Sequence, residues 1–100
     1  MTRRRLEADE VEAVLATHHA WRREAEHLVR VVDVATYQRG VDLVVAQAEV
    51  AERLDHHAVV TLEVNRVRFD VWTHDRGGIT ERDVDFIDEV DRLAALAIES

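Results

Sequence analysis

The sequence contains no cysteine and no proline, and only three of its 100 residues are glycine. Without cysteine, neither a disulfide framework nor a thiolate metal site can form. The chain also lacks an apolar run of the roughly 20 residues that a membrane-spanning helix needs. Its first ten residues are mostly charged, which is not typical of a secretory signal. These absences favour a cytoplasmic protein that is not embedded in a membrane.

Positive charge is also in short supply, since 13 basic residues face 21 acidic ones and the net charge is −8. Nucleic acids and anionic membranes attract clustered lysine and arginine, so neither is expected as a direct partner. The length suits one domain with one core, and the 47% share of hydrophobic residues is typical of a folded globular protein. We therefore expect a single domain over residues 1–100.

Apolar residues at helical spacing predict three helices. The first covers Leu6–His18, with acidic residues in its first turns, and the second covers Tyr37–Leu54, with Thr36 as its N-cap. The third opens at residues 80–83, a Thr-Glu-Arg-Asp capping box, and continues to the C-terminus. Its stripe comprises Val84, Ile87, Val90, Asp91, Ala94 and Ile98.

The second helix carries two apolar stripes. One contains Tyr37, Val41, Val44, Val45 and Ala48, and the other contains Leu43, Val50 and Leu54. A helix that is apolar on two sides is expected to be buried on two sides, by heavy packing or by a subunit contact.

Two pairs of strands are predicted between the helices. Residues 21–34 are dense in β-formers and predict a hairpin that turns near residues 23–26, with Trp21 as a core anchor. Val59–Asn65 and Val67–Thr73 alternate apolar and polar residues, with Asn65-Arg66 as a two-residue turn because asparagine tolerates the left-handed conformation. The resulting order αββαββα predicts an α+β fold, with three helices packed on one face of a four-stranded antiparallel sheet.

Histidines gather at the ends of the central elements. His56 and His57 follow the second helix, and His74 ends the last strand. Because a hairpin returns its far end to its start, His74 is expected to lie beside the pair. Imidazole gives or takes a proton near neutral pH. Three imidazoles at one pocket would suit the elimination of water, which protonates a leaving group and deprotonates its neighbour.

Each of these residues also has a plainer interpretation. Three histidines could bind zinc, although adjacent histidines rarely ligate the same ion. Asp83 could cap the last helix, serve the site, or do both, and Asp75 is expected to stabilise the loop at Gly77-Gly78. The second histidine pair, His18-His19, is interpreted as polar residues at a fraying helix end.

These residues together resemble the pterin-4a-carbinolamine dehydratase family. The motifs that carry the resemblance are Ala51-Glu52-Arg53, His56-His57, Thr73-His74-Asp75, Gly78-Ile79-Thr80 and Asp83, with Trp21 and Tyr37 near family aromatics. The resemblance implies a lyase that dehydrates 4a-hydroxytetrahydropterin to quinonoid dihydropterin without metal or organic cofactor, so that pterin is the substrate. It also implies a homodimer or homotetramer.

The resemblance implies roles for individual residues as well. His56 and His74 would handle the protons at the departing 4a-hydroxyl group and at N5, while His57 positions the ring. Glu52 and Asp83 would orient imidazoles or contact the pterin. Three further residues would support the site or bind the substrate, namely Trp72, Thr73 and Asp75.

The chain departs from the family pattern at three positions. Ala58 stands where the family has proline, which would loosen the exit from the helix, and Val64 replaces a tyrosine. Trp72 is bulkier than the family norm and is either a stacking wall for a pterin or a packing or interface aromatic. These departures keep open an alternative from another class, in which the fold is a dimerisation or assembly module with little catalytic activity.

Overall fold

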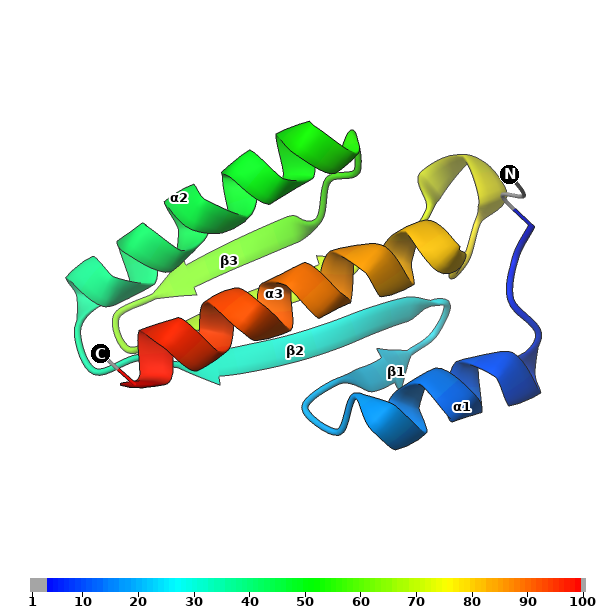
Figure 1. The fold of residues 1–100 in the computed structure, drawn as a ribbon, viewed down its shortest axis with the longest axis horizontal. Helices are drawn as coiled ribbons and strands as arrows, with labels where there is room; N and C mark the ends of the chain where they lie inside the picture. The colour runs from blue at the N-terminus through cyan, green and yellow to red at the C-terminus, as the bar shows by residue number, and fades with distance from the viewer. Residues whose placement is uncertain (1–3, 100) are drawn as a thin grey trace.

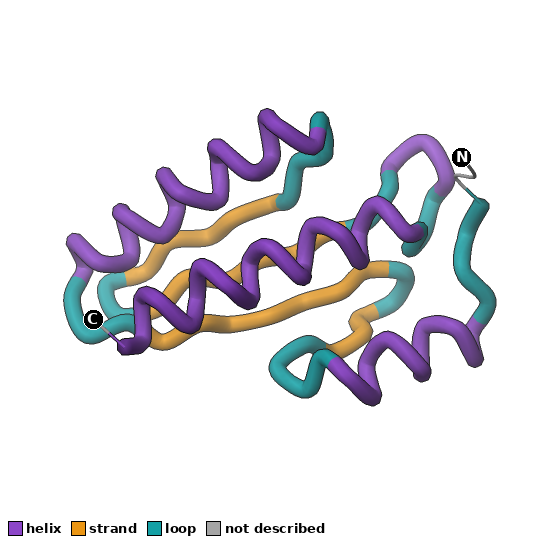
Figure 2. The backbone as a smooth tube through the Cα atoms, in the orientation of Figure 1, coloured by secondary structure: helices purple, strands orange, loops and turns teal. Residues whose placement is uncertain are grey.

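A computed structural model describes residues 4–99, with side chains up to Ala97. It contains one four-stranded antiparallel sheet, in the order β1-β2-β4-β3, and three α-helices packed against it (Figures 1 and 2). The predicted order αββαββα is therefore confirmed. The elements are α1 (Ala8–Thr17), β1 (Arg22–Glu24), β2 (His27–Asp33), α2 (Tyr37–Leu54), β3 (Val59–Glu63), β4 (Arg66–Val71), a short 3-10 turn η1 (His74–Arg76) and α3 (Glu81–Glu99).

One face of the sheet packs against α2 and α3 and forms the core. The register pairs Leu28 with Val71 and Val32 with Val67, so these side chains share the helix-covered face. They are buried together with Phe86, Ile87, Val90 and Ala94 of α3. Ile98, the last residue of the predicted α3 stripe, lies beyond the described side chains.

The opposite face of the sheet is largely charged. The side chains that alternate with the core residues include Glu24 and Arg68, whose Oε1 and Nη2 atoms are 2.9 Å apart. Val31 and Val59 are partly exposed on the same face, at 38% and 51%. Along β4, every second side chain points to this face. The same alternation determines which side chains reach the site at the end of the strand.

The predicted turn between the last two strands is wrong by one residue. Glu63 pairs with Arg66, so the two-residue turn is Val64-Asn65 rather than Asn65-Arg66. Asn65 is not left-handed. Within residues 4–99, the non-glycine residues with positive φ are Ala25, in the predicted β1–β2 turn, and Asp55. The carbonyl of Asn65 instead accepts a hydrogen bond from the Val34 amide at 3.0 Å, which ties this turn to the end of β2.

Only one of the two apolar stripes of α2 is buried within the chain. Leu43 and Val50 lie in the core, whereas Tyr37 and Val45 are 53% and 55% exposed. The expectation that α2 is buried on two sides is thus not met within one chain. Gly40 lets the buried side approach the sheet, because a Cβ there would come within 2.9 Å of Leu62 Cδ1.

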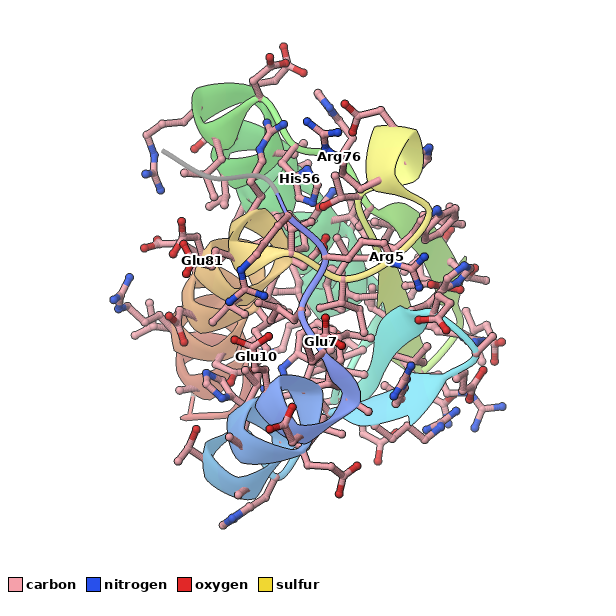
Figure 3. All side chains as sticks on the ribbon, turned by 90° about the vertical axis from the view of Figure 1, so that its right-hand side faces the viewer. Arg5, Glu7, Glu10, His56, Arg76 and Glu81 are labelled. Atoms are coloured by element: carbon pink, nitrogen blue, oxygen red, sulfur yellow. The ribbon has the colours of Figure 1, made fainter. Side chains whose placement is uncertain are left out.

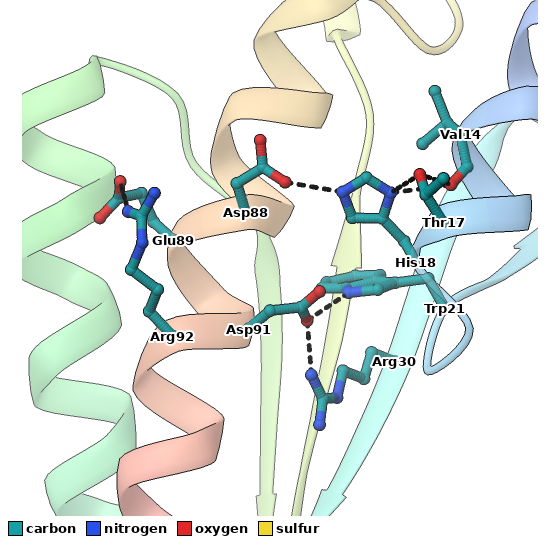
Figure 4. A network of polar contacts seen from close by, with 9 residues as sticks. All are labelled: Val14, Thr17, His18, Trp21, Arg30, Asp88, Glu89, Asp91 and Arg92. Carbon is teal, nitrogen blue, oxygen red and sulfur yellow. Dashed lines mark hydrogen bonds and ion pairs between the residues drawn. The ribbon is translucent and has the colours of Figure 1, made fainter.

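Helix α1 is attached to α3 by His18, which is not a fraying end. Its Nε2 atom lies 2.6 Å from Asp88 Oδ1, and its Nδ1 atom lies 2.7 Å from the Val14 carbonyl (Figure 4). Below it, Asp91 accepts hydrogen bonds from Trp21 Nε1 at 2.7 Å and from Arg30 at 2.5 Å. Trp21 is 4% exposed, which confirms it as a core anchor.

The contact between His18 and Asp88 predicts a pH-dependent stability. Partial burial opposes protonation, but the hydrogen bonds to Asp88 and to Val14 raise the pKa of His18 above its usual 6.5. The stabilisation is therefore fully present below about pH 6.5 and is lost as the pH rises through the raised pKa. We expect Asp88→Asn to lower the free energy of unfolding more at about pH 5.5 than at about pH 8.5, as measured by urea denaturation.

Asp85→Asn provides the control, because Asp85 is an exposed acid on the same helix. An effect of Asp88→Asn that is the same at both pH values would contradict the assignment to His18.

None of the helices in the described part of the chain combines the length and the apolar composition that a membrane-spanning segment requires.

Candidate active site

The three predicted histidines line one hollow at the end of the sheet. Its volume is about 250 Å³, and its other lining residues are Asp55, Thr73, Asp75 and Arg82. The hollow is open to solvent, and its volume is below the roughly 300–1,000 Å³ of pockets for drug-sized ligands, so it suits a small ligand. Figure 3 looks onto the end of the molecule that carries His56 and Arg76.

The histidine pair is placed by the end of α2. Asp55 adopts the left-handed conformation, with φ 51° and ψ 48°, and its amide bonds to the carbonyls of Ala51 and Glu52. The His56 amide then donates to the Ala51 carbonyl at 2.9 Å. This closure turns the chain sharply after the last helical residue, as in a Schellman-type ending, and directs His56 inward.

Arg82, which the sequence reasoning did not single out, holds this turn from α3. Its Nη2 atom donates to the carbonyl of Leu54 at 3.3 Å and to that of Asp55. Carbonyls at a helix C-terminus have no partner within the helix, so a cation from a neighbouring helix satisfies and fixes them. These bonds hold the exit from α2, although Ala58 stands where the resemblance implies a proline.

Asp83 is a fully buried carboxylate that joins the helix cap to the site. Its Oδ1 atom lies 2.5 Å from His56 Nε2, and its Oδ2 atom accepts from Thr73 Oγ1 and from the Thr80 amide, both at 2.8 Å. His56 itself is only 7% exposed. The Thr73 hydroxyl gives its proton to Asp83, so the Thr80 hydroxyl, 2.7 Å away, donates to Thr73. One side chain thus caps α3 and orients an imidazole.

His57 is paired with Glu52 one turn back. Its Nε2 atom lies 2.5 Å from Glu52 Oε2, and both side chains are mainly exposed. An exposed pair of this kind contributes little to stability. Its effect is to restrict the direction in which the His57 ring points.

His74 begins the turn η1, and its side chain is exposed. The loop that follows is closed by backbone bonds, from the Thr73 amide to the Gly78 carbonyl at 2.8 Å and from the Gly77 amide to the His74 carbonyl at 3.2 Å. The prediction that Asp75 stabilises this loop is not met, because its side chain makes no hydrogen bond or ion pair with the described residues. Asp75 lines the hollow instead.

Trp72 lies in a stack of three rings. Its ring centroid is 4.3 Å from that of His74, at an interplanar angle of 9°, and 3.7 Å from that of His27, at 2°. Both of its faces are covered, so neither is open to a pterin as a stacking wall in this arrangement. His27 was missed from the sequence, since only the register of β2 and β4 makes it a neighbour of Trp72.

Within residues 4–99, no three histidine, cysteine or carboxylate side chains are grouped so that they could hold a metal ion. The carboxylates nearest to the histidine pair, Asp83 and Glu52, each face an imidazole nitrogen instead.

Comparison with known proteins identifies the family of the chain. Residues 4–93 match the family described as pterin 4 alpha carbinolamine dehydratase. A protein of Mycolicibacterium smegmatis named "Putative pterin-4-alpha-carbinolamine dehydratase" is 40% identical over 88% of this chain and 94% of its own. One of the same name from Natronomonas pharaonis is 37% identical over 90% of this chain and 96% of its own.

Solved structures share the fold. A Brucella melitensis protein described as a transcriptional coactivator/pterin dehydratase superposes with a TM-score of 0.87 at 26% identity, over 90% of this chain and 98% of its own. A pterin dehydratase-like protein described as a RuBisCO assembly factor superposes with a TM-score of 0.65 at 22% identity, over 77% and 93%. At that identity the second likeness concerns the fold alone. With a match that spans nine-tenths of its length, this chain belongs to the pterin-4a-carbinolamine dehydratase family.

Proposed function

We propose that this protein is a hydro-lyase that converts 4a-hydroxytetrahydropterin into quinonoid dihydropterin and water. The observation that carries the proposal is the convergence of His56, His57 and His74 on one open hollow. The family membership and the size of the hollow support the same substrate class. Such a reaction would return a pterin cofactor to use after an aromatic hydroxylase has oxidised it.

The reaction is an elimination in which atoms and charge balance without an oxidant. The bond between C4a and the hydroxyl oxygen breaks, and the oxygen leaves as water after it takes up a proton. The proton on N5 is removed, and the electrons of the N5–H bond form the double bond between C4a and N5. The elimination is neither an oxidation nor a reduction, so it needs no redox cofactor, and we propose that the enzyme works with neither metal nor organic cofactor.

The contacts of the histidines suggest how the two proton transfers are divided. Asp83 accepts the Nε2 proton of His56, which leaves Nδ1 as the basic nitrogen, and the carboxylate stabilises the imidazolium formed when His56 takes the N5 proton. His74 is exposed and can exchange protons with water, so it supplies the proton to the departing hydroxyl. His57, held by Glu52, positions the ring.

A direct assay tests the proposal. The 4a-carbinolamine is generated in situ, and formation of the quinonoid product is followed with and without protein. We expect the intact protein to accelerate the reaction, and we expect a chelator to leave the rate unchanged because no metal takes part. An absence of acceleration by folded protein would overturn the proposal.

An alternative is supported by the surface of the helices. Tyr37, Val45 and Leu96 are 53–66% exposed, and an apolar hollow of about 370 Å³ lies between α2 and α3. Apolar groups that remain at the surface of one chain are typical of an interaction surface. In this alternative the fold serves as a dimerisation or assembly module. Sedimentation measurements would then show association of the protein, and the dehydration assay would show no acceleration.

A further inference from the structure

The three histidines of the site are held in two different ways. His56 and His57 each have a carboxylate 2.5 Å from Nε2. His74 has no such partner, and among the described residues its side chain makes no hydrogen bond or ion pair. Its ring stacks on the indole ring of Trp72.

The backbone of His74 does not determine where its ring points. The bonds of η1 fix the Cα and Cβ positions, through the Arg76 amide to the Thr73 carbonyl at 3.1 Å and the Gly77 amide to the His74 carbonyl at 3.2 Å. An exposed side chain on such a turn still samples several staggered rotamers. A ring lying parallel to it at van der Waals distance selects one of them.

The alternation at the end of β4 explains how Trp72 reaches His74. Val71 faces the core, Trp72 faces the uncovered side of the sheet, and Thr73 turns inward to Asp83. His74 then projects on the same side as Trp72, two residues on. Thr73 therefore contacts Asp83, the carboxylate that faces His56, and its neighbour Trp72 contacts the ring of His74.

His27 supports the far side of Trp72. The register pairs Leu28 with Val71, so His27 and Trp72 are the next residues across the two strands. The Nδ1 atom of His27 lies 2.8 Å from Asp70 Oδ1, a buried oxygen that has no hydrogen-bond partner among the described residues. His27 therefore lies between the indole ring of Trp72 and the carboxylate of Asp70.

We propose that Trp72 is a positioning residue that orients the His74 ring for proton transfer, with His27 as its support. This inference rests on the proposed dehydration. Trp72 contacts His74 rather than the reacting atoms, so its loss affects the rate of the chemical step and not the binding of substrate. A residue that serves as a stacking wall for the pterin would show the opposite pattern.

The test combines kinetics with NMR of the histidine protons. We expect Trp72→Leu to lower kcat about tenfold, while KM stays within about twofold. Trp72→Phe keeps an aromatic face and is expected to recover most of kcat. His27→Ala removes only the support and is expected to lower kcat by about threefold. Val59→Ala, at an exposed position of the same sheet face, is the matched control and should change nothing.

The NMR measurement needs no activity. The imidazole protons of His74 lie over an indole ring, whose ring current shifts their resonances upfield. In Trp72→Leu these resonances are expected to move downfield, while the backbone amide resonances remain dispersed as in a folded protein. Unchanged His74 resonances would overturn the stack, and a raised KM at constant kcat would overturn the positioning role. Failure of the wild-type protein to dehydrate would refute the proposed function but would leave the NMR result to judge the stack.

Discussion

Replacing His74 with alanine is expected to lower the turnover of the dehydration by at least tenfold and, on the usual contribution of a general acid or base, by about 10²–10⁴-fold. The fold should stay intact, because the His74 side chain is exposed and makes no hydrogen bond with the described residues. Steady-state kinetics with the in situ substrate give the rate, and circular dichroism with thermal unfolding checks the fold.

His19→Ala is the matched control. His19 is an exposed histidine that lines no part of the hollow, and among the described residues its Nε2 atom bonds to the Ala16 carbonyl alone, at 2.5 Å. If His74→Ala retained full turnover, His74 would be removed from the mechanism. If both variants lost turnover equally, the loss would reflect a general effect on the protein rather than proton transfer.

His56 is a less clear target for the same experiment. It is 7% exposed, and its partner Asp83 is fully buried. Removing the imidazole would leave a buried carboxylate oxygen without its partner, so a lost activity could follow from lost stability. His74 separates the two effects because its environment is open to water.

The fold could be predicted from the sequence because the spacing of apolar residues in each helix and strand agrees with the order of the elements along the chain. The alternation along β4 places Val67 and Phe69 on the covered face, as observed. The turn before β4 is shifted by one residue because Glu63 pairs with Arg66 across the strands, with Arg66 Nε 2.6 Å from Glu63 Oε1. The pairing of Glu63 with Arg66, and the hydrogen bond from the Val34 amide to the Asn65 carbonyl, outweigh the local preference of Asn65 for the left-handed region.

The stripes of α2 show a limit of periodicity. Both stripes are apolar, but periodicity cannot say which one meets the sheet. Gly40 marks the side of closest approach, because a Cβ at this position would lie 2.9 Å from Leu62 Cδ1, which would then have to move. The stripe with Val45 then remains at the surface.

The position of the three histidines at one hollow could be predicted, but Arg82, His27 and most of the contacts of the site could not. A hairpin brings His74 back toward His57, which is a matter of topology and can be inferred from the spacing. The contact of Asp83 with His56 joins residues 27 positions apart through the packing of α3 on α2. The stack of His27 on Trp72 depends on the register of strands that are not adjacent in sequence.

Asp83 is expected to carry the largest effect on stability. We expect Asp83→Ala to lower the free energy of unfolding by about 3–5 kcal/mol, the usual range when one partner of a buried polar pair is removed. The substitution leaves His56, the Thr73 hydroxyl and the Thr80 amide without their acceptor in a region that is fully buried. Urea denaturation at neutral pH measures the change.

Asp83→Asn separates the two functions of this carboxylate. An amide keeps one oxygen, so it can still accept the bonds from Thr80 and Thr73, but its NH₂ group then faces His56 where Oδ1 stood. We expect a smaller loss of stability, of about 1–3 kcal/mol, together with a fall in turnover, since the amide cannot stabilise an imidazolium. Asp85→Ala, an exposed acid on the same helix, should change stability by no more than about 0.5 kcal/mol. A stable Asp83→Ala variant with full activity would show that neither the helix cap nor the orientation of His56 depends on this carboxylate.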